Sequence, residues 1–301
     1  MGRGAVSAGS TSGSETSRMM PVPGELVRLE PRVRRLTQDN PSMFTAVGTN
    51  THLIGDRRVF ILDPGPESDV HFDRIVAAVG SATVAAVIPT HHHPDHWPLA
   101  PRLAAHFGAP TLGFSAYGDY VPQRTVADGE VLDSGEVRMR AIHTPGHAPD
   151  HLCYLLDDAG PPGGGGTLMS GDHVMGWSTS VIAPPGGNLN DFMASLRKLA
   201  ALELRVMYPA HGWSIDDPQA RIAELHQHRE QRTSQALDAL AAGLATIPAM
   251  VERIYADVDR RLHPAAARSL LAHLDALVEQ GRVRLKTASA DPLEAQYELV
   301  R

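Results

Sequence analysis

The chain has 301 residues, of which 43% are hydrophobic and 20% charged, a composition typical of a globular protein rather than a disordered or fibrous one. Its formal net charge of -7 gives no general attraction for nucleic acid or for anionic membrane surfaces. Cys153 is the only cysteine, so no disulfide can form within the chain, and no apolar run reaches the roughly 18 to 20 residues that span a bilayer. We therefore expect a cytoplasmic protein without a membrane partner.

Residues 1–20 are rich in Gly, Ser and Thr and predict a disordered tail. Residues 21–216 alternate short apolar runs with amphipathic stretches, separated by Gly, Pro, Asn and Asp, which predicts a domain of the α/β (α+β) class. The clearest predicted strands are His52–Gly55, Val59–Leu62 and Val84–Ile88, and the predicted helices are Val70–Val79, Pro98–His106 and Asn190–Leu202. The Gly- and Pro-rich stretch 160–166 is expected to be a surface loop.

Residues 217–301 change in character to helical sequence rich in Ala, Leu and Arg. Three amphipathic helices are predicted there, at residues 217–242, 247–259 and 264–280. An alternating run around Val283 and Leu285 and a last segment at 297–300 follow them. Three helices with a β-wing outline a small C-terminal domain of the winged-helix type.

The clearest chemical signal is the run Thr90-His91-His92-His93-Pro94-Asp95-His96, directly after the predicted strand Val84–Ile88. Neutral imidazole and carboxylate are the nitrogen and oxygen ligands that zinc prefers. Alternate residues of a loop can converge on one point, whereas His92 alternates away from that point. The candidate ligands in this run are His91, His93, Asp95 and His96.

This run matches the HxHxDH signature of the metallo-β-lactamase superfamily, and later segments resemble further motifs of that family in the same order. They are Thr144–His147, similar to TPGH; Ser170–Asp172, similar to SGD; and Tyr208–Gly212, similar to the terminal PxHG motif. Asp63 falls where the family keeps an early Asp beside the site. The resemblance covers about residues 25–212 and implies the family's αββα sandwich, two sheets packed face to face with helices outside.

The resemblance also implies a metal site with two Zn²⁺ ions per chain. It assigns His91, His93 and His147 to one ion, and Asp95, His96 and His211 to the other, with Asp172 as the bridge. Such a pair of ions can share a hydroxide nucleophile whose parent water has a pKa of about 7. Asp95 would orient this nucleophile and is the predicted catalytic residue, while Asp63 would support the ligands from behind. The same ligand types would also accept iron or manganese.

A narrower branch of the family is suggested by Asn40–Thr45 and Gly48–Gly55, which resemble its NPxxFTxxGTNTYLVG opening. That branch includes a lactamase-like endoribonuclease with a winged-helix tail, glyoxalase-II-like proteins and acyl-carrier-protein thioesterases. This chain departs from the family pattern at Trp97-Pro98, where Gly-Gly usually follows HxHxDH. The bulky Trp97, together with His173 beside the bridging position, is therefore a candidate substrate contact.

The first functional hypothesis is hydrolysis of a small-molecule ester, thioester or related acyl substrate. Cleavage of single-stranded RNA at the same site is the alternative, and Arg282, Arg284 and Lys286 near the wing are the candidate RNA contacts. The charge argues against it, because residues 221–301 hold 11 basic and 11 acidic side chains. An iron-dependent non-hydrolytic enzyme and a binding-only regulator are further readings. The tail could also serve a homodimer.

Overall fold

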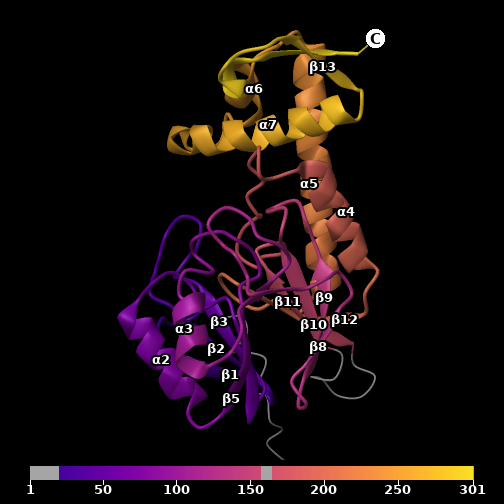
Figure 1. Cartoon of the computed structure of the whole chain (residues 1–301). Helices are drawn as coiled ribbons and strands as arrows, with labels where there is room; N and C mark the ends of the chain where they lie inside the picture. Colours follow the sequence, from indigo (N-terminus) through magenta and orange to yellow (C-terminus); the bar gives the residue numbers. More distant parts are fainter. Residues whose placement is uncertain (1–19, 157–164, 301) are drawn as a thin grey trace, which may run out of the picture.

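The computed structural model describes residues 20–156 and 165–300, so the predicted tail, except for its last residue, and most of the predicted loop at 160–166 lie outside the described residues. Two five-stranded sheets form the centre of the larger domain (Figure 1). In spatial order the first contains β1 (Leu26–Glu30), β2 (Val33–Thr37), β3 (Asn50–Ile54), β4 (Arg58–Leu62) and β5 (Thr83–Ile88). The second contains β12 (Leu204–Pro209), β11 (Gly166–Gly171), β10 (Leu152–Leu156), β9 (Arg138–His143) and β8 (Val131–Asp133).

Each sheet is mostly antiparallel and has one parallel pair, β4 with β5 and β11 with β12. The prediction of a loop at 160–166 is wrong for its last residue. Gly166 is the first residue of β11 and pairs with Leu204. A further short parallel pair joins β6 (Leu112–Gly113) and β7 (Arg124–Thr125). The three predicted strands coincide with β3, β4 and β5 to within about two residues at each end.

The inner strands β3, β4 and β10 are buried on both faces of their sheets, and their side chains alternate between two cores. In β4, Phe60 and Leu62 point into the core between the sheets, whereas Val59 and Ile61 join the core under the helices. In β10, Tyr154 points between the sheets, and its neighbours on either side join the other core. An inner strand of this four-layer architecture is covered on both sides, which favours apolar side chains along its whole length.

Helices cover the two outer faces of the sandwich. The first sheet is covered by α2 (Asp69–Val79) and α3 (Ala100–Phe107), the second by α4 (Leu189–Ala200) and the beginning of α5 (Pro218–Ala241). α2 begins where the Ser68 side chain accepts a hydrogen bond from the backbone N–H of His71. The predicted αββα sandwich is thus confirmed.

A separate core lies in the C-terminal region, which forms the predicted winged helix. It packs the end of α5 against α6 (Ile247–Ile254), α7 (His263–Glu279) and the wing strands β13 (Val283–Thr287) and β14 (Gln296–Leu299). Two short 3-10 helices, η1 (Arg260–Leu262) and η2 (Pro292–Glu294), complete this region.

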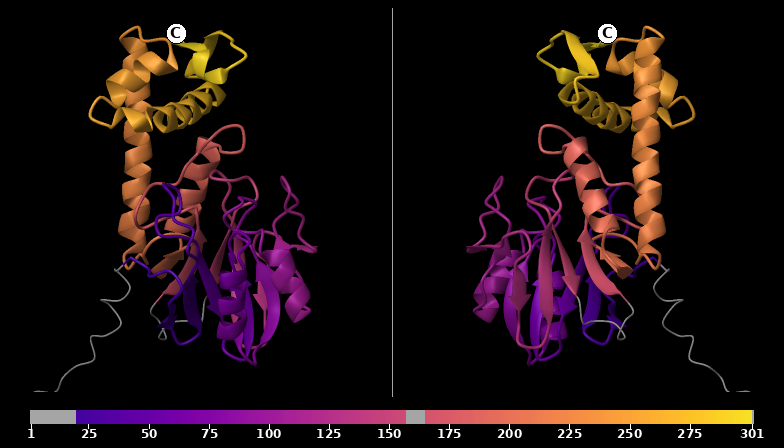
Figure 2. Two further views of the ribbon diagram at one scale, coloured as in Figure 1. Left: turned by 90° about the vertical axis from the view of Figure 1, so that its left-hand side faces the viewer. Right: turned by 90° about the vertical axis from the view of Figure 1, so that its right-hand side faces the viewer.

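Helix α5 contributes to the core under the second sheet and to the core of the winged helix. Its Ile222 and Leu225 pack under the second sheet, while Ala236, Ala239 and Leu240 pack in the winged helix. Figure 2 shows the helix running from one body to the other as a continuous rod. The predicted division after residue 216 thus falls just before a helix that both domains share.

Of the helices in the described ranges, none is both long and apolar enough to cross a membrane.

One predicted helix is too long. The helix expected at residues 247–259 ends at Ile254. The guanidinium of Arg232 lies 4.5 Å from the ring centroid of Tyr255 and donates a hydrogen bond to the carbonyl of Ile254. Because Tyr255 turns into the small core and the last carbonyl is already capped, the helix stops there.

Candidate metal centre

The predicted ligands lie at one edge of the sandwich, where four strands end. The histidine run follows β5, His147 follows β9 by four residues, Asp172 directly follows β11, and His211 follows β12 by two residues. β11 is parallel to β12, and β9 runs in the same direction because β10 is antiparallel to both β9 and β11. Strands of one direction end at the same edge, so residues far apart in sequence meet there.

Three imidazoles form the first group of potential metal ligands, His91, His93 and His147. The Nε2 atom of His91 lies 2.8 Å from Nδ1 of His93 and 3.2 Å from Nε2 of His147. The Nε2 atom of His147 lies 3.0 Å from Nδ1 of His93. Three ring nitrogens that converge so closely are arranged as one cation would require.

The second group contains Asp95, His96, Asp172 and His211. The Nε2 atom of His211 lies 3.3 Å from a carboxylate oxygen of Asp95 and 3.3 Å from Oδ1 of Asp172. The other oxygen of Asp172, Oδ2, lies 3.6 Å from Nε2 of His96 and 3.6 Å from Nε2 of His147 in the first group. Asp172 therefore stands between the two groups.

The residues fit a metal ion on grounds beyond their chemical types. Both ring nitrogens of His96, Nε2 of His211 and Oδ1 of Asp172 are buried and make no hydrogen bond in the described part of the chain. Unsatisfied buried polar atoms are costly, and a bound cation satisfies them at once. The Asp95 side chain is 27% exposed, whereas that of His96 is fully buried, so the centre opens on the Asp95 side.

The two groups differ in their electrostatics. Burial, reinforced by the neighbouring His147, lowers the pKa of His93 to about 3 and keeps the ring neutral, the form that binds metal. Burial alone would raise the pKa of Asp95, but His96 and His211 lower it to about 2. Burial alone would lower the pKa of His211, but the two adjacent carboxylates raise it to about 9. In the second group, therefore, protons on histidine balance carboxylates, and a divalent cation can replace those protons.

Backbone and side-chain partners fix the orientation of the ligands. The Nδ1 atom of His147 donates to the carbonyl of Val181 at 2.6 Å, which leaves Nε2 free to face the other ligands. The carboxylate of Asp63 accepts from the backbone N–H of Thr90 at 2.7 Å and lies 3.2 Å from Nδ1 of His96. Asp63 itself has φ of 48°, a strained conformation for a residue other than glycine.

Three further residues, outside the predicted ligand set, support the ligands. His151 accepts a hydrogen bond from the backbone N–H of Asp172 at 3.1 Å, and Thr49 donates to the carbonyl of Asp95 at 2.9 Å. Asn50 donates to the carbonyls on either side of His211, those of Pro209 and Gly212, at 3.1 and 2.9 Å. Thr49 and Asn50 belong to the Gly48–Gly55 motif, which therefore could have pointed to them.

The remaining residues singled out in the sequence lie around this centre. Trp97 is half-buried, with its ring 5.5 Å from that of Tyr120. His173 is fully buried, with its ring 4.4 Å from that of Phe192, and neither of its nitrogens has a hydrogen-bond partner in the described residues. His92 turns away from the ligands, as expected, and its Nδ1 lies 2.6 Å from Asp150.

Two family models match the sequence. The metallo-beta-lactamase superfamily model matches residues 44–211, and the beta-lactamase associated winged helix domain matches residues 246–289. A crystal structure of a beta-lactamase domain protein from Burkholderia ambifaria shares the fold, with a TM-score of 0.78, 21% identity, and coverage of 95% of this chain and 96% of that one.

Curated relatives match at similar length. An atrochrysone carboxyl ACP thioesterase of Aspergillus chevalieri is 33% identical over 258 residues, 81% of this chain and 80% of that protein. The lactamase-like protein vrtG of Penicillium aethiopicum is 33% identical over 264 residues, 83% of this chain and 81% of that protein. The chain therefore belongs to the metallo-β-lactamase superfamily, as a hydrolase with a C-terminal winged helix.

Proposed function

We propose that the protein is a dinuclear zinc-dependent hydrolase that cleaves acyl thioesters or related esters. The observation that carries the proposal is the position of Asp172, whose Oδ2 atom is equidistant, at 3.6 Å, from Nε2 of His147 and of His96. A carboxylate between two ligand groups suits a bridge between two cations. Three imidazoles in the first group, and imidazoles together with carboxylates in the second, are ligand sets that suit zinc.

Two zinc ions bound there would supply a water of lowered pKa and would polarise the scissile carbonyl. The protein's own contribution is to hold and orient. Asp95 is the carboxylate on the open side of the centre and can accept a hydrogen bond from the attacking water. Thr49 and Asp63 restrain the loop that carries Asp95 and His96. A fixed carboxylate lowers the cost of aligning the water with the substrate.

An apolar rim favours an acyl substrate. Tyr117 is 40% exposed, and its ring lies 4.3 Å from that of His92, between two ligands. Val181 is 44% exposed on the loop that orients His147, and Phe44 is 53% exposed on the loop leading to Gly48, whose carbonyl lies 3.2 Å from Nδ1 of His211. Exposed apolar side chains gathered on loops at a site mark a surface for an apolar ligand.

The relatives support a thioester in particular. Two proteins named as ACP thioesterases, from Aspergillus chevalieri and Aspergillus fumigatus, match this chain at 30% identity or more over at least four-fifths of both chains. We infer that the acyl group is presented as a thioester on a carrier or a carrier-like thiol. The relatives named only as lactamase-like proteins neither support nor oppose this choice.

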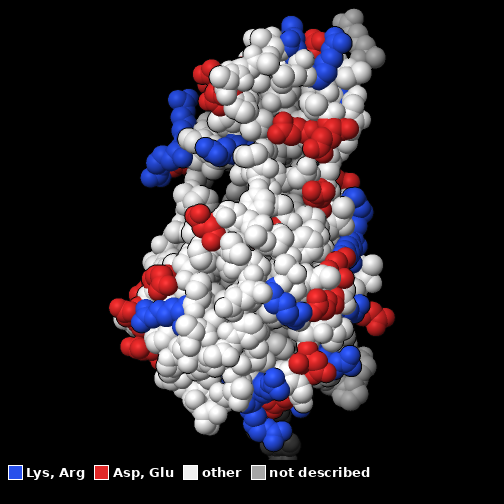
Figure 3. Space-filling view, in the orientation of Figure 1, with Lys and Arg blue, Asp and Glu red and all other residues white. Residues whose placement is uncertain are grey.

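The alternative, cleavage of RNA, finds less support in the charges. Arg284, one of the three candidate RNA contacts, is paired with Glu298 across the wing at 2.6 Å. On the face that Figure 3 presents, basic and acidic side chains are interspersed over both domains. A phosphate-binding groove instead requires a continuous basic stripe.

The test is a substrate panel with the zinc-loaded full chain: acyl thioesters, esters, a β-lactam and single-stranded RNA. We expect turnover of thioesters and its loss in Asp95→Asn, with Asp128→Asn as the matched control. Asp128 carries the same change at an exposed ion pair with Lys198, outside the centre. No thioester or ester turnover would refute the proposal, and RNA cleavage in its place would establish the alternative. Bound iron in place of zinc would contradict the choice of metal.

A further inference from the structure

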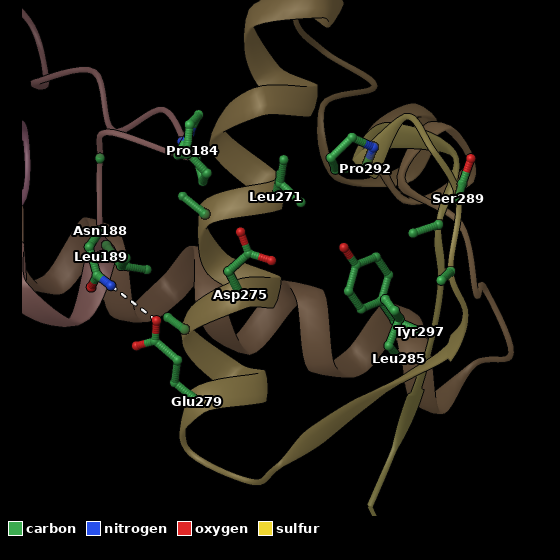
Figure 4. A pocket seen from close by; sticks show the side chains of 16 residues that line it. Pro184, Asn188, Leu189, Leu271, Asp275, Glu279, Leu285, Ser289, Pro292 and Tyr297 are labelled. Atoms are coloured by element: carbon green, nitrogen blue, oxygen red, sulfur yellow. Dashed lines mark hydrogen bonds between the residues drawn. The ribbon is translucent and has the colours of Figure 1, made fainter. Parts of the chain in front are cut away.

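A cavity of about 560 Å³ lies between the two domains, away from the metal ligands. Its walls come from α7, from the wing and from the loop that leads into α4 (Figure 4). The apolar part of the lining includes Pro184, Leu271, Ala276, Leu285 and Pro292. The volume falls in the range of about 300 to 1,000 Å³ that is usual for sites of small organic ligands.

Two polar side chains without protein partners face each other across this cavity, Asp275 from α7 and Tyr297 from β14 (Figure 4). Tyr297 is only 3% exposed, yet its hydroxyl makes no hydrogen bond within the described residues. Asp275 is partly buried and, over the same residues, forms neither a hydrogen bond nor an ion pair. Both polar groups line the cavity and have no hydrogen-bond partner among the described residues, so this pair is available to a ligand that reaches both.

The cavity is acidic as well as apolar. Among the described residues, its lining includes Asp275 and Glu279 and contains no Lys, Arg or His. Glu279 already has partners, because it accepts hydrogen bonds from Asn188 at 3.0 Å and from Asn190 at 2.7 Å. These bonds connect α7 to the catalytic domain. Asp275 is the carboxylate left for a ligand. Burial, together with Glu279, raises the pKa of Asp275, as expected for a negative charge that lacks a counterion.

We propose that this cavity binds an organic cation, a protonated amine on an apolar body. The ammonium group would donate to the carboxylate of Asp275 and to the hydroxyl oxygen of Tyr297, which supplies the missing partners of both. The apolar body would replace water along Leu271, Leu285 and Pro184. An anion would meet two carboxylates and no cation, and a neutral apolar ligand would leave Asp275 without a partner.

The position of the cavity connects it to the metal centre. Pro184 and Pro185 in its wall follow Val181 by three and four residues, and the carbonyl of Val181 orients His147. A bound amine would therefore restrain the loop that fixes one metal ligand. Amine binding itself does not require the reaction assigned to the protein, because none of the described residues that line the cavity is a candidate metal ligand.

The test is calorimetric titration of the full chain with three probes of one shape: 1-naphthylmethylamine, 1-naphthalenemethanol and 1-naphthoate. We expect the amine to bind at least about tenfold more tightly than the alcohol, and the carboxylate not to bind, because the charge-assisted contact is the discriminating one. Asp275→Asn should weaken amine binding about tenfold, and Tyr297→Phe should weaken it less. Asp257→Asn, an exposed acid of the same domain, is the matched control and should bind like the wild type.

A second variant keeps the test decisive if Asp275→Asn fails to fold. Leu285 is 46% exposed, so Leu285→Lys should fold, and it places a tethered cation in the cavity wall. This variant should lose amine binding while its thermal unfolding stays unchanged. Equal binding of the three probes, or amine binding that survives both Asp275→Asn and Leu285→Lys, would overturn the proposal.

Discussion

The Nδ1 atom of His147 lies 2.6 Å from the carbonyl oxygen of Val181, on a loop that α5 holds in place. Arg229 of α5 donates to the carbonyl of Ser180, and Arg221 donates to those of Met175 and Ser178 at 2.9 and 2.6 Å. A helix shared with the winged helix thus determines how one predicted metal ligand is oriented.

This relationship predicts the effect of Arg229→Met on metal affinity. The side chain keeps its length but can no longer donate to Ser180, so the loop should loosen and His147 should be less well oriented. Partners of metal ligands contribute about 10- to 100-fold in affinity, and we expect a loss of about tenfold for zinc. Chelator competition measures it. Arg253→Met, at an exposed position of α6, is the control, and an unchanged zinc affinity in Arg229→Met would refute the coupling.

Metal content should follow the two ligand groups. We expect about two zinc ions per purified wild-type chain. His91→Gln and His211→Gln should each lower the content, and Asp172→Asn should lower it most, because Asp172 contacts both groups. Elemental analysis of protein purified without added metal provides the measurement. His143→Gln is the matched control, since His143 stacks on Phe114 at 3.7 Å and is not in either group.

Two glycines should respond very differently to the same substitution. Gly146 has φ of +129°, and a Cβ there would lie 2.3 Å from the backbone of Phe192 in α4. Gly108 has φ of +64° and open space around it. We expect Gly146→Ala to cost about 3 kcal/mol or more in unfolding free energy, and Gly108→Ala about 1 kcal/mol. Urea unfolding measures both, and equal costs would contradict the close approach of α4 to the His147 loop.

Acid should destabilise the fold through His273. Burial, followed by Arg229, His228 and Arg232, lowers its pKa to about 3. Between about pH 6.5 and pH 3, His273 therefore binds a proton in the unfolded chain but not in the folded chain. The free energy of unfolding falls as the pH falls through this range. One such group contributes up to about 1.4 kcal/mol per pH unit.

The variant His273→Gln removes this proton uptake from the unfolded state. Its unfolding free energy should accordingly depend less steeply on pH than that of the wild type, when both are measured by urea titration at pH 7, 6 and 5. His263→Gln is the comparison, at a more exposed position whose ring lies 3.3 Å from the carbonyl of Val258. Identical slopes for wild type and His273→Gln would show that His273 is not held neutral.

Much of the candidate site was predictable because its residues lie directly after strands. The histidine run follows a strand that its short apolar run identifies, and Asp172 and His211 stand in motifs that resemble those of the family and lie at the ends of β11 and β12. The supporting residues were less predictable. His151 acts through its ring on the backbone of Asp172, a contact that depends on how β10 and β11 pair.

Contacts between distant segments account for the other differences. The end of α6 is held by Arg232, which binds the carbonyl of Ile254 although it lies 22 residues earlier in the chain. Helix-end signals in the sequence around Ile254 therefore could not have predicted it. Helix α5 packs its beginning under the second sheet and its end in the winged helix. The helical pattern of its sequence alone does not show which part packs against which domain. The cavity has the same origin, because Pro184 and Tyr297 meet only after the winged helix has docked on the catalytic domain.

The most direct test of the central claim is the rate of thioester hydrolysis by metal-stripped and zinc-reloaded full chain. Hydrolysis should disappear when a chelator removes the metal and should return as zinc is added, with full rate at about two equivalents per chain. A rate that survives complete removal of the metal, or zinc-loaded protein that hydrolyses no thioester, would contradict the assignment.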